Sequence, residues 1–217
     1  MPFFHFPCDY VYWTHVDDHE SIKAKYLPKI RESEKKHKNN SQGIIGDVIT
    51  SYTKDDFTTN KAVEFINKPD ILKSVVWDSI DKLLKDNRED KNMWKIGFKE
   101  SYIQVSWYTS YGANAYFPLH THDDGAPIIS DGRVYYPSFS MIYIINDENE
   151  KNSTMFKTFE NHKSLSHRKE ITFDTSRIPD IKEGSVLIFP AHLSHYVIQA
   201  IKPGRVTLAY NLYSTYD

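Results

Sequence analysis

Residues 116–125 read Tyr116-Phe-Pro-Leu-His120-Thr-His122-Asp123-Asp124-Gly125. Side chains at positions i, i+2 and i+4 of a strand lie on one face. In an extended segment His120, His122 and Asp124 therefore point the same way, and their donor atoms can converge on one metal ion. Two histidines and one carboxylate form the facial triad that binds Fe(II) and leaves the opposite positions open. The segment predicts one half of such a centre, with His122 and Asp124 as the histidine and the carboxylate.

A second histidine follows in a suitable order. Gly184 supplies a turn, residues 186–189 form a buried apolar strand, and Pro190 ends it. Two histidines come after this strand. His192 is expected in the loop, whereas His195 begins the next strand, and we therefore predict that His195 completes the metal triad with His122 and Asp124.

An arginine follows ten residues after His195, beyond the turn at Pro203-Gly204. The turn sends the chain back as an antiparallel partner, after roughly five residues or ~16 Å of strand. Arg205 then begins the return strand at its far end from the metal. A five-carbon 2-oxo dicarboxylate fits between them, because its distal carboxylate can pair with the Arg205 guanidinium in a fork. Thr207 lies on the same face as Arg205 and adds a hydroxyl donor.

The rest of the sequence predicts a mainly β fold of the α+β class. Aromatic residues at positions 3–14 indicate a strand, and helices are expected from Asp17 or Asp18 to Lys36 and from Asn67 to Lys85. Turns separate seven further strands, at 102–108, 138–146, 153–159, 171–175, 185–189, 195–200 and 205–213. This pattern is typical of a jelly roll, a cupin-like double-stranded β-helix barrel, with an N-terminal helical buttress. We predict a single domain over 1–217, with a strand-plus-helical part at 1–97 and a jelly-roll core at 98–217.

Composition restricts the class of protein. The 217 residues are 40% hydrophobic, which suffices for a sizeable core, and the net charge of −2 gives no overall signal for nucleic acid or an anionic membrane. One cysteine, Cys8, allows no internal disulfide and suits a reducing compartment. The sequence shows no apolar run of the ~20 residues that a membrane helix needs, and residues 1–7 do not resemble a signal peptide. We expect a cytoplasmic protein, compatible with a homodimer, that acts on a small molecule or a residue of a larger substrate.

These motifs resemble the 2-oxoglutarate/Fe(II)-dependent dioxygenase superfamily, and within it a bacterial and phage branch with a Phe-x-Pro-x-His-x-His element. The resemblance covers roughly residues 98–213. It is carried by Phe117-Pro-Leu-His-Thr-His122, residues 139–145, Glu183-Gly184, Leu187-Ile-Phe-Pro190, His195 and Gly204-Arg205. It implies Fe(II), 2-oxoglutarate and O2 as cofactor and co-substrates, and an oxidation that releases succinate and CO2, with hydroxylation of an unidentified substrate as the default outcome.

The resemblance also implies further pocket residues. Trp107 or Tyr108, on the strand before the histidine cluster, would contact 2-oxoglutarate. On the strand at 138–146, the side chains of Ser140, Ile142 and Ile144 would face inward and that of Tyr143 outward.

Two alignments with the superfamily pattern Pro-x-His-x-Asp are open. In the first, Pro118 makes His120 the first ligand, His122 stands in place of the carboxylate, and His195 completes a three-histidine site. In the second, which we prefer, the ligands are His122, Asp124 and His195, and His120 lies beside them.

Two other functions remain open. One is a cupin-like three-histidine metalloenzyme that does not use 2-oxoglutarate, and the other is a non-catalytic jelly-roll binding module. A second His-x-Asp sequence, His15-Val-Asp17, precedes the first predicted helix without a strand ladder behind it. We interpret it as part of a helix cap.

Overall fold

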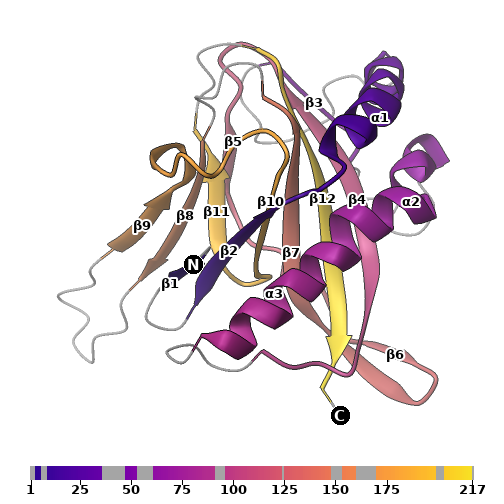
Figure 1. Cartoon of the computed structure of the whole chain (residues 1–217), viewed down its shortest axis with the longest axis vertical. Coiled ribbons are helices and arrows are strands. Elements are labelled where there is room, and N and C mark those ends of the chain that lie inside the picture. Colours follow the sequence, from indigo (N-terminus) through magenta and orange to yellow (C-terminus); the bar gives the residue numbers. More distant parts are fainter. Residues whose placement is uncertain are drawn as a thin grey trace.

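The computed structural model describes residues 3–5, 9–35, 47–52, 61–90, 96–123, 125–147, 153–159, 170–198 and 203–216. Its strands form two antiparallel sheets (Figure 1). The eight-stranded sheet has the order β1-β2-β10-β7-β12-β4-β3, with β6 paired to β7, and the four-stranded sheet has the order β5-β11-β8-β9.

Most of the strands overlap the segments that the sequence predicts, whereas β3 and β6 fall outside them. The large sheet contains β1 (Phe3–His5), β2 (Tyr10–His15), β3 (Val48–Thr50), β4 (Glu100–Tyr111), β6 (Ile128–Ser130), β7 (Arg133–Asn146), β10 (Ser185–Pro190) and β12 (Arg205–Thr215). The small sheet contains β5 (Phe117–His120), β8 (Thr154–Phe159), β9 (Glu170–Asp174) and β11 (Ser194–Val197).

Helices cover the outer face of the large sheet (Figure 1). They are α1 (His19–Glu34), the 3₁₀ helix η1 (Lys61–Asn67), α2 (Pro69–Ile71), the π-helix η2 (Leu72–Trp77) and α3 (Asp78–Glu89). The α1 and α3 helices confirm the two predicted helical regions, although α1 ends at Glu34 and Asp18 caps it without a side-chain hydrogen bond. None of the helices in the described ranges is long and apolar enough to cross a membrane.

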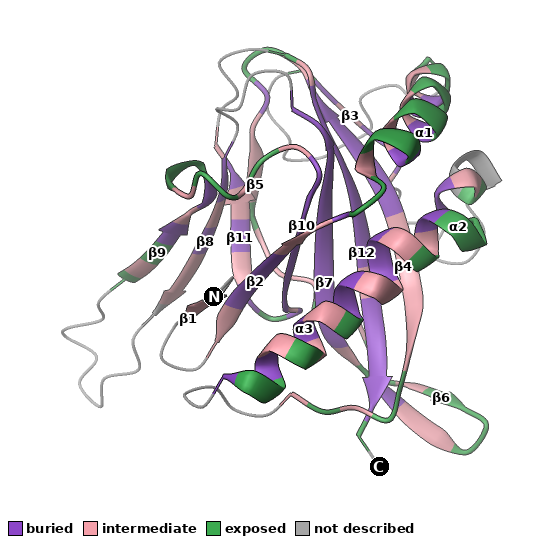
Figure 2. Cartoon of the chain, viewed as in Figure 1, coloured by how far each residue is buried: buried purple, intermediate pink, exposed green. Residues whose placement is uncertain are grey.

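Strand β12 separates two hydrophobic layers, because its side chains alternate. Even-numbered residues, from Val206 to Leu212, join the core beneath the helices. Odd-numbered residues, from Arg205 to Asn211, therefore face the space between the two sheets. Among the described residues, the central strands β7, β10 and β12 are almost entirely buried (Figure 2). A second core, which includes Trp13, Leu187 and Phe156, packs the two sheets together.

The mainly β, jelly-roll fold with helical additions is confirmed. The first hundred residues also contribute to the sheet itself, since β2 pairs with β10 and β3 pairs with β4. They extend the large sheet as well as supporting it.

Candidate metal centre

Three histidines meet between the sheets. His120 ends β5 and stands opposite His195 of β11 in the strand register. His122 lies beyond the end of β5, and its backbone N–H donates to the Ala191 carbonyl at 2.8 Å, which returns this segment to the site. One ring nitrogen from each histidine lies within 4.8 Å of those of the other two. The three imidazoles can therefore share one metal ion.

A hydrogen bond orients each ring. The Nδ1 atoms lie 2.7 to 3.1 Å from carbonyl oxygens, which only accept, so each Nδ1 carries the hydrogen. The acceptors are the backbone oxygens of Pro118 for His120 and Leu193 for His195, and the side-chain Oδ1 of Asn211 for His122. Each Nε2 thus keeps its lone pair, which is the arrangement that metal-binding histidines usually show.

The surroundings keep two of these rings neutral. Burial, followed by repulsion from His120, lowers the pKa of His122 from 6.5 to about 4. Burial, with repulsion from His120 and His122, lowers the pKa of His195 well below its ordinary value, and only 2% of that residue is exposed. Both rings are therefore uncharged at neutral pH and can act as ligands through the nitrogen that carries no hydrogen.

Arg205 begins β12 on the inner face of that strand and is 1% exposed. Its Nη2 donates to Thr154 Oγ1 at 2.8 Å, and its guanidinium lies 5.6 Å from the centroid of the Tyr111 ring. Its Nε and Nη1 are buried and have no hydrogen-bond partner among the described residues. Thr154 pairs with Val197, two residues from His195, so Thr154 is offset from the level of His195 by about 7 Å along the strand.

Comparisons with known proteins agree with this geometry. No family model and no curated protein sequence matches the chain. Among solved structures, OsALKBH1 superposes with a TM-score of 0.60 at 11% identity, over 96% of this chain and 99% of that one. The non-haem α-ketoglutarate-dependent carbocyclase SnoK from nogalamycin biosynthesis gives 0.55 at 8% identity, over 94% and 79%. The chain has the fold of the 2-oxoglutarate/Fe(II)-dependent oxygenases.

A third structure with this oxygenase fold is HygX from Streptomyces hygroscopicus, with nickel and 2-oxoglutarate bound. It gives a TM-score of 0.50 at 11% identity, over 94% of this chain and 82% of that one. The resemblance drawn from the sequence motifs is thereby confirmed for the fold.

Of the two predicted ligand sets, the structure brings together His120, His122 and His195. Asp124, the carboxylate of the preferred set, lies outside the described residues. The rival histidine, His192, lies in the turn after β10, where its Nε2 is 2.6 Å from Asp9 Oδ1.

The structure corrects the prediction for Tyr108. This residue stands opposite Leu208, and both side chains pack in the core beneath the helices. The Tyr108 hydroxyl donates to Ser33 Oγ of α1 at 3.1 Å, away from the histidines. The odd-numbered residues of β4 face inward instead. The Trp107 ring lies 5.4 Å from the His122 ring, and the Tyr111 ring contacts Arg205.

The other predicted pocket residues lie on the expected faces. Thr207 is 4% exposed and shares the inner face of β12 with Arg205. Ser140 is also inward, since its hydroxyl lies 3.0 Å from His122 Nδ1, whereas Tyr143 packs beneath the helices.

Sequence reasoning missed Asn211 and Thr154. Asn211 continues the odd-numbered face that contains Arg205 and Thr207, so extending that alternation by two steps would have found it. No comparable signal marks Thr154, whose contact with Arg205 depends on how the two sheets face each other.

The second His-x-Asp sequence belongs to no group of metal-ligating side chains in the described ranges. His15 Nε2 lies 3.3 Å from Asp180 Oδ1, and Asp17 accepts a hydrogen bond from Lys82 at 2.8 Å. Its side chains therefore join α3 and the loop before β10 to the end of β2.

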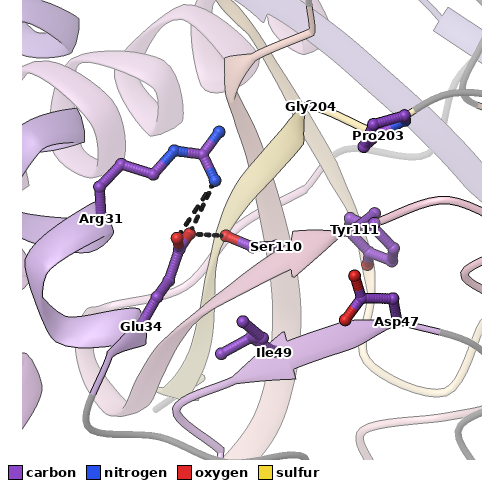
Figure 3. A pocket seen from close by; sticks show the side chains of 9 residues that line it. Arg31, Glu34, Asp47, Ile49, Ser110, Tyr111, Pro203 and Gly204 are labelled. Carbon is purple, nitrogen blue, oxygen red and sulfur yellow. Dashed lines mark hydrogen bonds and ion pairs between the residues drawn. The ribbon is translucent and has the colours of Figure 1, made fainter.

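A separate pocket of about 300 Å³ lies at the end of β4 and contains none of the three histidines (Figure 3). Arg31 donates to Glu34 Oε1 at 2.9 Å, and the Ser110 hydroxyl also donates to Glu34. These side chains satisfy one another and tie α1 to β4. The pocket therefore carries no set of donors directed at a metal.

Proposed function

We propose that this chain is an Fe(II)- and 2-oxoglutarate-dependent oxygenase that hydroxylates a substrate and releases succinate and CO2. The observation that carries the proposal is the pairing of two features between the two sheets. Three imidazoles can share one metal ion, and a buried arginine, whose Nε and Nη1 have no partner in the described part of the chain, bonds to Thr154 about two strand residues from the level of His195.

The histidines fit a ferrous ion. Imidazole nitrogen is a suitable ligand for iron, as it is for zinc, copper and nickel, and three ligands on one face leave coordination positions open. His120, His122 and His195 would hold the metal. Their Nδ1 hydrogen bonds fix the rings before the metal arrives, which reduces the ordering that binding requires.

Arg205 fits the distal carboxylate of 2-oxoglutarate. A guanidinium only donates, and leaving a buried donor without an acceptor is unfavourable. A carboxylate can accept from Nε and Nη1 together in the bidentate geometry that arginine favours. Thr207 would add a hydroxyl from the same face of β12.

When bound together, iron and 2-oxoglutarate supply the chemistry that activates O2 for oxidation of a substrate. The chain orients the ligands, holds the co-substrate carboxylate at Arg205 and keeps water out. Burial of His195, Trp107 and Arg205, each at most 7% exposed, supports a dry site.

A spectroscopic titration tests the proposal. Anaerobic protein would be mixed with Fe(II) and 2-oxoglutarate, and the visible charge-transfer band of the chelate would be recorded. We expect the band in the wild type and in His192→Ala, and its loss in His195→Ala. Folded wild-type protein that retains iron but gives no band with 2-oxoglutarate would contradict the proposal.

The same titration distinguishes the two ligand sets. His120→Ala should abolish the band if the three histidines hold the metal, and Asp124→Ala should abolish it if the carboxylate does.

The three-histidine group favours a second candidate, a cupin-like metalloenzyme that does not use 2-oxoglutarate. Such an enzyme would bind metal with the same histidines but would have no need of a carboxylate at Arg205. Conversion of 2-oxoglutarate to succinate by the iron-loaded protein separates the two candidates, since the second predicts none.

A further inference from the structure

His122 differs from the other two histidines in how its ring is held. His120 and His195 each donate from Nδ1 to the backbone oxygen two residues earlier, at Pro118 and Leu193. These bonds follow from the local chain path and depend little on which side chains surround them. His122 has a side chain as its acceptor, Asn211 on a strand 89 residues away in the sequence.

A triangle of polar atoms surrounds this bond. His122 Nδ1 lies 2.7 Å from Asn211 Oδ1 and 3.0 Å from Ser140 Oγ. The Ser140 hydroxyl donates to the same Asn211 oxygen at 3.0 Å. Asn211 and Ser140 are direct partners in the pairing of β12 with β7. The central strands of the large sheet therefore fix the acceptor at one point.

The chemistry of the acceptor determines the tautomer of the ring. A neutral imidazole carries one hydrogen, on Nδ1 or on Nε2, and the hydrogen bond at one nitrogen decides which. An amide oxygen accepts and cannot donate, so it favours the hydrogen on Nδ1. With the hydrogen there, Nε2 keeps a lone pair that can bind a metal. With the hydrogen on Nε2, that nitrogen could not bind a metal.

We infer that Asn211, supported by Ser140, is a positioning residue that holds His122 in the Nδ1–H tautomer and so makes it a metal ligand. This inference rests on the proposed metal centre. Asn211 acts through His122, and Ser140 acts by orienting the Asn211 amide. The partner is neutral, so it orients the ring without adding charge to the site.

The first test measures the tautomer in metal-free protein by the ¹⁵N chemical shifts of the histidine rings, with His122→Phe to identify the signal. The wild type should show hydrogen on Nδ1. Asn211→Asp keeps an acceptor at the same place and should show the same tautomer. Asn211→Leu removes the acceptor at similar volume and should shift the signal towards the Nε2–H form. Asn211→Ala removes the same acceptor and replaces Asn211→Leu if the latter does not fold.

The second test measures affinity for Zn(II), a redox-inert ion that imidazole binds well. Loss of an outer hydrogen-bond partner typically weakens metal affinity ~10–100-fold, and we expect this for Asn211→Leu. Asn211→Asp should bind at least as tightly as the wild type, and Ser140→Ala should show a smaller loss. Asn87→Leu is the matched control, because Asn87 is a buried asparagine of α3 that accepts from Ile96 N–H. Its affinity should be unchanged.

An unchanged tautomer together with unchanged Zn(II) affinity in Asn211→Leu, or in Asn211→Ala, would overturn the inference. A wild type that binds no metal would instead overturn the proposed function. The tautomer measurement would still decide the role of Asn211 in that case, because it uses the metal-free protein.

Discussion

Replacement of Arg205 by methionine separates a binding role of this side chain from a structural one. Methionine is unbranched and apolar, so it can fill most of the space of the arginine without its charge. The wild-type guanidinium has one hydrogen bond, to Thr154, and a contact with the Tyr111 ring. Its Nε and Nη1 are buried without a hydrogen-bond partner in the described part of the chain.

The expected magnitudes follow from these contacts. Two charge-assisted bonds to a carboxylate, at the lower value of ~1.5 kcal/mol each, contribute ~3 kcal/mol, or a roughly 150-fold weaker affinity for 2-oxoglutarate in Arg205→Met. In the ligand-free protein, the variant loses the Thr154 bond, ~1.5–3 kcal/mol, and the cation–π contact, ~0.5–2 kcal/mol. It also relieves two unsatisfied donors, at ~1–3 kcal/mol each. These terms nearly cancel, so the free energy of unfolding should change by less than about 2 kcal/mol.

Calorimetric titration of 2-oxoglutarate into the metal-loaded protein, and urea denaturation without the ligand, measure the two quantities. Arg133→Met is the control, since Arg133 forms a partly exposed ion pair with Glu100 on the same sheet and should leave the affinity unchanged. An Arg205→Met affinity within about three-fold of the wild type would refute the assignment of Arg205 to the carboxylate. A loss of stability of several kcal/mol would show instead that the guanidinium supports the fold.

Other measurements check the metal, the fold and its pH dependence. Zn(II) at 100 times its dissociation constant should raise the free energy of unfolding by ~2.7 kcal/mol in the wild type and in His192→Ala, and should have no effect in His195→Ala; thermal denaturation with and without the ion shows this. Gly184→Ala should cost about 1–3 kcal/mol in urea denaturation, because Gly184 has a φ of +87° and an added Cβ would lie 3.1 Å from His19 Cγ. Hydrogen bonds from an ammonium and a phenol hydroxyl lower the pKa of Asp70 from 3.8 to about 2. The folded-state pKa is the lower one, so this stabilisation is present above about pH 4 and is lost as the pH falls towards 2; urea denaturation over this range should show a shallower decline for Asp70→Asn.

Alternation of side chains made the sheets predictable, and the same rule explains where prediction failed. The long strands β7 and β12 were both predicted, β12 to within two residues, whereas β7 begins at Arg133, five residues before the predicted start at 138. Strand β3 has three residues, Val48–Thr50, which is too short for any periodicity. Its place at the sheet edge depends on pairing with β4, which the local sequence does not specify.

The error at Tyr108 has the same origin. The two faces of β4 are both rich in aromatic residues, so composition alone cannot tell which face is inward. Its pairing with β12 decides this, since a slip of one residue would exchange the faces. The observed register places Tyr108 opposite Leu208 and Thr109 opposite Thr207. The inward aromatic residues are therefore Trp107 and Tyr111.

The two neighbouring histidines of the candidate centre were predicted from the alternation of side chains along a strand, but only one of them lies in a strand. His120 and His122 were expected together because alternate residues of a strand share a face. Strand β5 ends at His120. His122 reaches the centre because its N–H bonds to Ala191 and its ring bonds to Asn211, both distant in the sequence. Because the strand ends at His120, alternation along it gives no basis for placing Asp124 on the same face as the histidines.

A centre of three neutral imidazoles has a consequence for the ligand that joins it. A carboxylate ligand would reduce the charge of a ferrous ion, whereas three histidines leave both positive charges on the metal. Arg205 adds a third, and it forms no ion pair with any of the described residues. Buried charges are unfavourable unless they are paired. In the proposed site, a dianion such as 2-oxoglutarate would bind the metal with one end and Arg205 with the other. Each positive group should therefore strengthen the binding of the dianion to the other group. Metal and co-substrate should then bind cooperatively, and Arg205→Met should weaken that coupling without removing the histidine ligands.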